Sequence, residues 1–195
     1  MTDTTSVVLS GVGGQGIILA STIVARAALH AGHDVKTNEV HGMAQRGGSV
    51  VAEIRYGHKV HSPLVEPGTA VALAALERIE ALRYAHYLMP GGLAVVSTLS
   101  IVPVTASSGQ ATYPADAEAR LRAVFPRLVY IDATGMADGV GNAKAGNVVI
   151  LGALSTGLDL PEAAWVASIR ESVPAEHLAL NQAAFAAGRG HPAVS

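Results

Sequence analysis

The sequence predicts an α/β domain with a mixed, mainly parallel sheet and a helical C-terminal third. Short apolar runs alternate with helix-length segments over most of the chain. A glycine cluster, Gly11 to Gly16, separates the first apolar run from the first helical segment, which indicates a parallel crossover. Beyond a glycine-rich connection that ends at Gly146, the pattern is mainly helical.

The first half of the chain sets the expected topology. An apolar run at 7–9 predicts a buried strand, and apolar residues at helical spacing predict a helix over 17–31. The elements expected next are a strand at 34–37, a loop over 38–48, a strand over 49–56 and a hairpin partner at 59–61, after a turn at Gly57-His58. Such a hairpin is antiparallel, so it makes the sheet mixed.

The second half continues the alternation and then becomes helical. The expected elements are a strand at 70–74, a helix over 76–88 ended by Pro90-Gly91-Gly92, strands at 93–97 and 128–132, a loop at 103–113, and helices over 114–125, 147–158, from Pro161, and 174–188. Neither an internal repeat nor a long linker divides the sequence, so we expect one domain over residues 1–195.

Composition narrows the class of protein. Hydrophobic residues make up 50% of the chain and charged residues only 14%, against about 25% charged residues in an average soluble domain. The apolar runs are interrupted well before the roughly 20 residues of a membrane-spanning helix. We therefore expect no membrane association and an obligate subunit whose surface is partly covered by partners.

Charge and cysteine content argue against nucleic-acid binding and against a thiolate-held redox centre on this chain. The net charge of −2 gives no electrostatic footprint for nucleic acid. The first residues lack the features of a signal peptide, so the expected location is the cytoplasm. With no cysteine, the chain supplies no thiolate to an iron–sulfur cluster, and any redox centre must lie on another chain.

The glycine cluster has two interpretations. Gly11, Gly13 and Gly16 match the dinucleotide-binding spacing between a strand and a helix, and Glu39 stands roughly where an acid would bind the ribose. Alternatively, the glycines only let the first helix pack closely on the sheet. The pattern alone does not separate these alternatives.

Longer motifs carry a family resemblance. They are Gly11-Val12-Gly13-Gly14-Gln15-Gly16, Glu39-Val40-His41-Gly42-Met43-Ala44-Gln45-Arg46-Gly47-Gly48, Asn147-Val148-Val149-Ile150-Leu151-Gly152-Ala153-Leu154 and Asn181-Gln182-Ala183-Ala184-Phe185-Ala186-Ala187-Gly188. In this order they resemble the gamma domain family of 2-oxoacid:ferredoxin oxidoreductases. The resemblance is strongest to the branch in which this domain is a separate chain, the beta subunit of indolepyruvate ferredoxin oxidoreductase.

The resemblance implies a three-layer Rossmann-like fold and a subunit role. In this family a large partner subunit holds thiamine diphosphate, magnesium and iron–sulfur clusters, and decarboxylates a 2-oxoacid such as an arylpyruvate. The acyl group passes to coenzyme A and the electrons pass to ferredoxin. The chain itself is expected to bind no cofactor alone, to be inactive alone, and to complete the active-site cavity and the coenzyme A side.

The second motif supplies the candidate catalytic residues. The Arg46 guanidinium suits a carboxylate or phosphate, so the resemblance implies contact with coenzyme A or the substrate; the alternative is an ion pair across a subunit interface. His41 and Glu39 are candidate acid–base groups, although His41 alternatively only shapes the loop. Gln45 is a neutral hydrogen-bonding candidate.

The first motif supplies the candidate ligand contacts. Gly13, Gly14, Gln15 and Gly16, together with Arg46, are candidate contacts to the phosphates of coenzyme A, because free N–H groups at a helix start favour anions. The alternative for the glycines is tight packing only. Two rival functions stay open: a free-standing NAD(P)- or nucleotide-binding enzyme, and a scaffold whose cleft is vestigial.

Other polar residues have structural explanations. His58 and His61 are close in sequence but have no third ligand nearby, so we expect them to face solvent and predict no metal site. Asp132 is expected to cap a helical turn near Thr134. Asn147 and Asn181 lie in apolar helices and should each have a buried hydrogen-bond partner.

Overall fold

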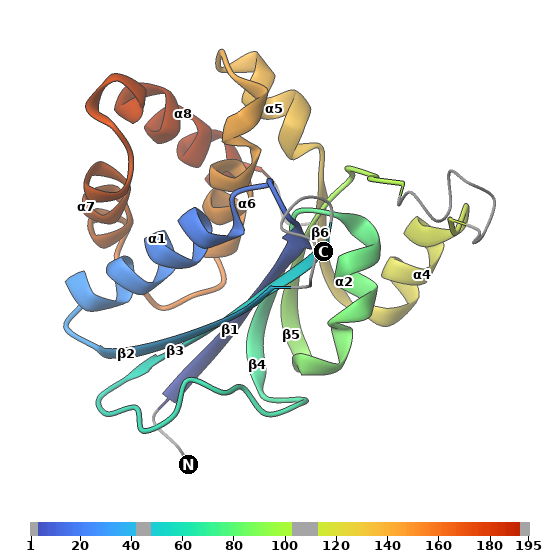
Figure 1. Ribbon diagram of the computed structural model, residues 1–195, viewed down its shortest axis with the longest axis horizontal. Helices are drawn as coiled ribbons and strands as arrows, with labels where there is room; N and C mark the ends of the chain where they lie inside the picture. The colour runs from blue at the N-terminus through green and yellow to red at the C-terminus, as the bar shows by residue number, and fades with distance from the viewer. Residues whose placement is uncertain (1–3, 42–47, 103–112, 192–195) are drawn as a thin grey trace.

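A computed structural model describes residues 4–41, 48–102 and 113–191. Within these residues a six-stranded sheet has the order β2-β3-β1-β4-β5-β6 (Figure 1). Only β3 runs antiparallel to the rest, since it pairs antiparallel with β1 and β2 while β1, β4, β5 and β6 pair in parallel. The predicted mixed, mainly parallel sheet is confirmed.

The elements have the following bounds. The strands are β1 (Thr4–Val12), β2 (Asp34–His41), β3 (Ser49–Gly57), β4 (Ala70–Ala75), β5 (Leu88–Ser97) and β6 (Arg127–Ile131). The helices are α1 (Ile17–His30), α2 (Arg78–Arg83), α4 (Ala117–Val124), α5 (Ala133–Gly139), α6 (Gly146–Ser155), α7 (Glu162–Ser172) and α8 (Leu178–Arg189), with short 3-10 turns η1 (Ala85–Tyr87), η2 (Ala143–Ala145) and η3 (Ala175–His177).

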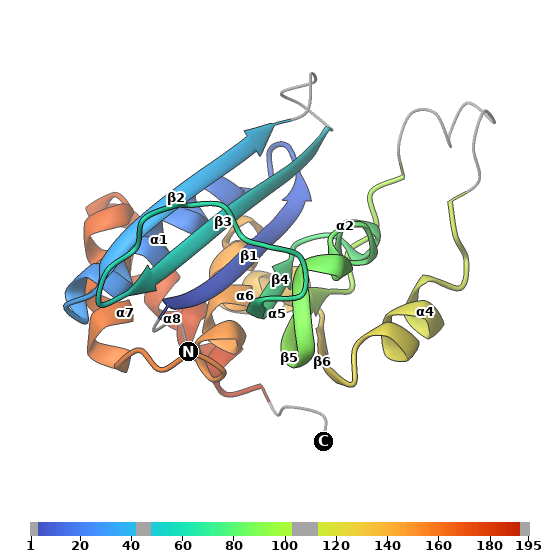
Figure 2. The same cartoon turned by 90° about the horizontal axis from the view of Figure 1, so that it is seen from below.

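Helices on both faces of the sheet make the predicted three layers. Helices α1 and α6 pack on one face, with α7 and α8 outside them, and α2 and α4 pack on the other (Figures 1 and 2). Strand β1 is buried on both sides: Val7 and Leu9 join the core under α1 and α6, and Val8 joins the core under α4. None of the helices in the described residues has the length and hydrophobicity for a membrane crossing.

Several local predictions are confirmed. The predicted apolar stripe of α1 is buried, from Ile17 to Ala28, as expected for an amphipathic helix on a sheet. Asp132 caps α5 by accepting a hydrogen bond from the Gly135 N–H at 2.9 Å. The buried Asn147 and Asn181 amides donate to the Gly16 and His177 carbonyls at 3.3 and 2.8 Å, so each has a partner, but Gly16 is only half-buried and His177 is exposed, whereas buried partners were predicted.

The predicted hairpin was wrong. Strand β3 pairs with β2, which extends through 38–41 where a loop was predicted, and residues 59–61 form no strand. Because β3 is buried over most of its length, the backbone N–H and C=O groups on both of its edges need hydrogen-bond partners, and β1 and β2 provide them. Residues 59–61 are instead held by Asp34, whose carboxylate accepts the Val60 N–H at 2.8 Å. This hydrogen bond, followed by one from Lys36, lowers the Asp34 pKa.

The predicted helix over 76–88 was too long. Glu77 caps its first turn through the Ile79 and Glu80 N–H groups, α2 ends at Arg83, and Leu88 already begins β5. The Pro90-Gly91-Gly92 segment lies inside β5, where the pairing with β4 shifts between Leu88 and Leu93. Strand β6 pairs with β5 only from Leu93 onward, so a proline without an N–H is tolerated before that point.

Two glycines let α6 and α8 approach each other closely. A Cβ on Gly152 would overlap the Phe185 carbonyl oxygen, and a Cβ on Gly188 would overlap the Val149 carbonyl oxygen. Both contacts are with backbone, which cannot rotate away as a side chain can. The glycine of the C-terminal motif is therefore fixed by helix packing.

We predict that Gly188→Ala lowers the free energy of unfolding by about 3 kcal/mol, because α8 must move away from α6. The matched control is Gly139→Ala in α5, where a Cβ meets no atom within 4 Å. That control should change stability by no more than about 0.5 kcal/mol. Urea unfolding of the purified chains measures both, and equal losses would contradict the packing argument.

Candidate functional site

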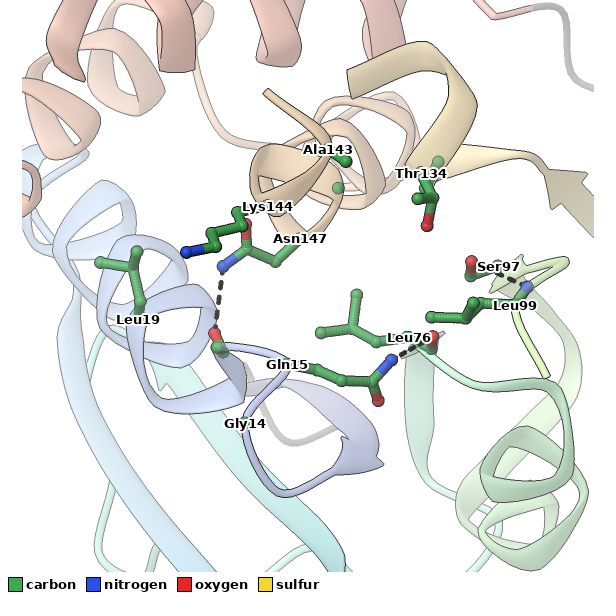
Figure 3. Close-up of a pocket in the computed structure, with 13 residues that line it drawn as sticks. Gly14, Gln15, Leu19, Leu76, Ser97, Leu99, Thr134, Ala143, Lys144 and Asn147 are labelled. Atoms are coloured by element: carbon green, nitrogen blue, oxygen red, sulfur yellow. Dashed lines mark hydrogen bonds between the residues drawn. The ribbon is translucent and has the colours of Figure 1, made fainter. Parts of the chain in front are cut away.

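A cleft of about 370 Å³ opens at the carboxyl edge of the sheet. The residues that line it follow β1, β4, β5 and β6 and begin α1, α5 and α6 (Figure 3): Gly14, Gln15, Gly16, Leu19, Leu76, Ser97, Leu99, Ala133, Thr134, Ala143, Lys144, Gly146 and Asn147. The chain continues from β1 into α1 on one face and from β4 into α2 on the other. Such a switch between neighbouring strands is where open α/β sheets bind ligands.

The turn after β1 depends on glycines in left-handed backbone conformations. Gly14 and Gly16 have φ values of +100° and +81°, which other residues rarely adopt. A Cβ on Gly16 would also lie 2.5 Å from Asn147 Nδ2, whereas a Cβ on Gly14 would meet nothing within 4 Å. Gly16 therefore allows both the turn and the contact between α1 and α6.

Gln15 connects the two strands that flank the switch. Its Oε1 accepts the Val12 N–H at 2.6 Å, and its Nε2 donates to the Leu76 carbonyl at 2.8 Å. Gly11 leaves room for this side chain, since a Cβ there would lie 2.8 Å from Gln15 Oε1. Gln15 lines the cleft with both ends of its amide engaged, so its observed role is to fix the cleft floor.

The cleft wall favours negative ligands. In the described residues, the N–H groups of Gly14 and Gly16 have no acceptor, and the starts of α1 and α6 add the positive ends of two helix dipoles. Lys144 stands exposed at the rim, and no described carboxylate forms a salt bridge with it. The lining set contains no acidic residue.

The two motifs meet through the main chain. The Gly13 N–H donates to the Gly48 carbonyl at 2.8 Å, so the end of the second motif is tied to the glycine turn. This bond occupies the Gly13 N–H, while Gly14, Gln15 and Gly16 line the cleft. The role of all four residues in ligand binding stays a prediction.

Of the four candidate catalytic residues, two fall within the described part of the chain. Glu39 lies half-buried on β2, accepts the Ser21 hydroxyl at 2.6 Å, and is absent from the cleft lining. His41 is the last residue of β2 and pairs with Val50. Gln45 and Arg46 lie outside the described residues, so their predicted roles stay predictions.

The histidine pair behaves as an ordinary surface feature. His58 and His61 are both exposed. Across the described ranges, no three histidine, aspartate or glutamate side chains gather in a way that could hold a metal ion.

Comparison with known proteins identifies the family. The family model of pyruvate ferredoxin/flavodoxin oxidoreductases matches residues 6–190. The chain belongs to this family. The indolepyruvate oxidoreductase subunit IorB of Thermococcus kodakarensis is 42% identical over 188 residues, which span 94% of this chain and 93% of that relative. The chain is thus a subunit of a 2-oxoacid:ferredoxin oxidoreductase.

Solved structures agree with this family assignment. The gamma subunit of a keto/oxoacid ferredoxin oxidoreductase from Geobacter sulfurreducens is 25% identical, with a TM-score of 0.69 over 94% of this chain and 95% of that one. A 2-oxoglutarate:ferredoxin oxidoreductase from Magnetococcus marinus, with 2-oxoglutarate, coenzyme A and succinyl-CoA bound, shares the fold at 20% identity and a TM-score of 0.71. The match covers 97% of this chain and 31% of that longer chain.

The structure of the oxidoreductase subunit adds cleft residues that the sequence did not single out. Lys144 and Thr134 come from the glycine-rich connection after β6, and Leu99 comes from the segment after β5. A lysine between Asn142 and Gly146 was the available signal, because a cation beside a helix start suits an anion. The three-dimensional position of this connection was needed to relate it to Gly14.

We predict that Gly16→Ala destabilises the oxidoreductase subunit more than Gly14→Ala. Both changes place a Cβ in a left-handed conformation at a cost of about 1–2 kcal/mol. Gly16→Ala also displaces the Asn147 amide, which should add about 1 kcal/mol. Urea unfolding of the two variants provides the comparison, and equal costs would show that the Asn147 contact contributes nothing.

Proposed function

We propose that residues 1–195 form a gamma-type domain that completes the active-site cavity of a coenzyme A-acylating 2-oxoacid:ferredoxin oxidoreductase. The large partner subunit carries thiamine diphosphate, magnesium and iron–sulfur clusters. That subunit decarboxylates an arylpyruvate such as indolepyruvate, electrons pass to ferredoxin, and the acyl group passes to the coenzyme A thiol. This chain provides the coenzyme A side.

The observation that carries the proposal is the character of the cleft. Coenzyme A is a polyanion with an extended, partly apolar arm. The N–H groups of Gly14 and Gly16, which have no acceptor in the part of the chain that the structure describes, the two helix starts and Lys144 offer one wall that suits phosphate. Leu76 and Leu99 offer an apolar wall opposite (Figure 3). The residues present therefore fit such a ligand.

The relatives support the two ligands named in the proposal. Indolepyruvate appears in the name of the Thermococcus kodakarensis relative. Coenzyme A and succinyl-CoA are bound in the Magnetococcus marinus enzyme whose fold this chain shares. The lack of cysteine in this chain fits a division of labour in which another subunit holds the iron–sulfur clusters.

The second motif completes the proposed site. We assign Arg46 to a carboxylate or phosphate of the substrates, with Gln45, His41 and Glu39 as further contributors to the shared site. This assignment rests on the family resemblance. The described link from Gly48 to Gly13 supports it, because it holds the end of the motif against the turn that lines the cleft.

The alternative function, a free-standing NAD(P)-binding enzyme, is not favoured. A dinucleotide site needs an acid at the end of the second strand for the ribose. Glu39 accepts the Ser21 hydroxyl and does not line the cleft. The family match over 6–190 also places the chain among oxidoreductase subunits.

We expect Lys144→Ala to raise the apparent KM for coenzyme A about tenfold in the reconstituted complex, the equivalent of roughly 1.4 kcal/mol. The kcat at saturating coenzyme A should stay unchanged, because the lysine binds phosphate and not the reacting atoms. Lys59→Ala is the matched control, since Lys59 is also exposed but follows β3 at the opposite edge of the sheet. An unchanged KM in Lys144→Ala would contradict this role.

Arg46→Ala is expected to lower kcat/KM by at least about tenfold, because no other residue replaces a bidentate guanidinium. Steady-state kinetics of the complex, with size-exclusion chromatography to check assembly, measure the effect. If turnover and assembly are both unchanged, Arg46 has no role in the site and the scaffold interpretation is favoured.

The purified chain alone should show no saturable binding of NAD⁺ or NADP⁺ in isothermal titration calorimetry. The cleft lacks the carboxylate that would bind the ribose hydroxyls. Tight, stoichiometric binding of either dinucleotide would overturn the subunit function in favour of the dinucleotide enzyme.

A further inference from the structure

The buried carboxylate of Glu77 holds the chain segment that forms one wall of the cleft. Glu77 is 2% exposed. Its Oε1 accepts the Ile101 N–H at 3.3 Å and the Tyr113 hydroxyl at 2.6 Å. Its Oε2 accepts the Ile79 and Glu80 N–H groups at 2.6 and 3.0 Å. One side chain thus joins the start of α2 to two segments that are distant in sequence.

Arg78 strengthens the same connection. Its N–H donates to the carbonyl of Leu99, a cleft residue, at 3.2 Å. Its guanidinium donates to Ser100 Oγ at 3.2 Å and to the Tyr113 hydroxyl at 3.0 Å, and lies 5.1 Å from the centre of the Tyr113 ring. Burial, and then the hydrogen bond to Glu77, raise the Tyr113 pKa, so this phenol keeps the proton that it donates.

Glu80, in the first turn of α2, and Tyr84, the residue after its end, hold the beginning of β3. Glu80, which is 6% exposed, accepts the Ser49 hydroxyl and pairs with Arg83 at 3.0 Å. The Ser49 hydroxyl also lies 3.0 Å from the Tyr84 hydroxyl. Ser49 follows Gly48, whose carbonyl accepts the Gly13 N–H of the glycine turn. Residues of α2 and its caps are therefore bonded both to the Leu99 segment of the cleft wall and to the beginning of β3, which is joined to the glycine turn through Gly48.

We infer that α2 is a positioning bracket, in which Glu77 and Glu80 keep the Leu99 wall and the beginning of β3 in a fixed relation. The Glu80 N–H donates directly to Glu77, so the Glu77 carboxylate is tied to the backbone of the residue that binds Ser49. The bracket sets the width of the cleft before a ligand enters it. The expected effect of the bracket on coenzyme A binding rests on the function proposed above. Glu77 and Glu80 are positioning residues and touch no reacting atom.

The first test measures coupling between the segment that contains Ile101 and the beginning of β3, without assuming a ligand. Hydrogen exchange is followed by mass spectrometry in the full chain assembled with its partner. Ser49→Ala should speed amide exchange in the peptide that contains Ile101 about three- to tenfold, and Tyr113→Phe should do the same at the beginning of β3. Tyr56→Phe and Ser62→Ala are matched controls, since neither hydroxyl bonds to α2. If each change alters amide exchange only near the substituted residue, the positioning role of α2 is overturned.

The second test measures function in the same complexes. Ser49→Ala and Tyr113→Phe should each raise the apparent KM for coenzyme A about three- to tenfold with kcat unchanged. If Lys144→Ala raises this KM and the bracket variants do not, the positioning role is overturned while the coenzyme A site stands. If none of the three variants changes KM but the exchange coupling is present, the coenzyme A site is overturned while the bracket stands.

Discussion

The Gln15 side chain makes the contact on which the cleft depends. In a sheet whose crossovers lie on opposite faces of two neighbouring parallel strands, the ends of those strands separate and leave backbone groups without ladder partners. Gln15 satisfies the Val12 N–H on one side and the Leu76 carbonyl on the other. Gly11 makes room for it, and the left-handed Gly16 then turns the chain into α1. The glycine cluster thus closes the floor of the cleft, while the Gly14 and Gly16 N–H groups have no acceptor among the described residues.

Three buried acidic residues lie outside the cleft lining. Glu53, Glu77 and Glu80 are buried, and a buried carboxylate is tolerated only where donors surround it. Backbone N–H groups, hydroxyls and an amide supply those donors: Asn38 binds Glu53, Tyr113 binds Glu77 and Ser49 binds Glu80. Satisfying the carboxylates therefore also fixes the chain segments that carry these donors. Among the described residues that line the cleft, none is acidic.

Local signals in the sequence predicted those elements that local interactions determine. The stripe of α1 and the Asp132 cap were predictable because each depends on spacing within one segment. The burial of Asn147 followed from its place in an apolar helix, but its partner, the Gly16 carbonyl, lies 131 residues away and was not predicted. The pairing of β3 could not be predicted in this way, because residues 59–61 offered a plausible hairpin and only the need to cover both edges of β3 selects β2. The end of α2 was missed for a similar reason: Leu88 fits a helical stripe, but its pairing with Ala70 is tertiary. Lys144 entered the site only when the connection after β6 was placed in space.

The position of β3, which the sequence did not predict, also explains why the glycine fingerprint does not favour a dinucleotide site here. In the nucleotide-binding arrangement the second strand lies beside the first, and its terminal acid reaches the ribose of a ligand bound at the glycine turn. Here β3 lies between β1 and β2, which moves β2 to about 10 Å from β1, or two strand spacings. Glu39 then faces Ser21 on the flank of α1. Anion binding at such a turn needs only N–H groups and helix starts, which this insertion leaves in place, whereas ribose binding needs an acid beside the turn. The insertion of β3 therefore separates the acid of β2 from the glycine turn, which agrees with the function proposed above, in which this chain binds no dinucleotide.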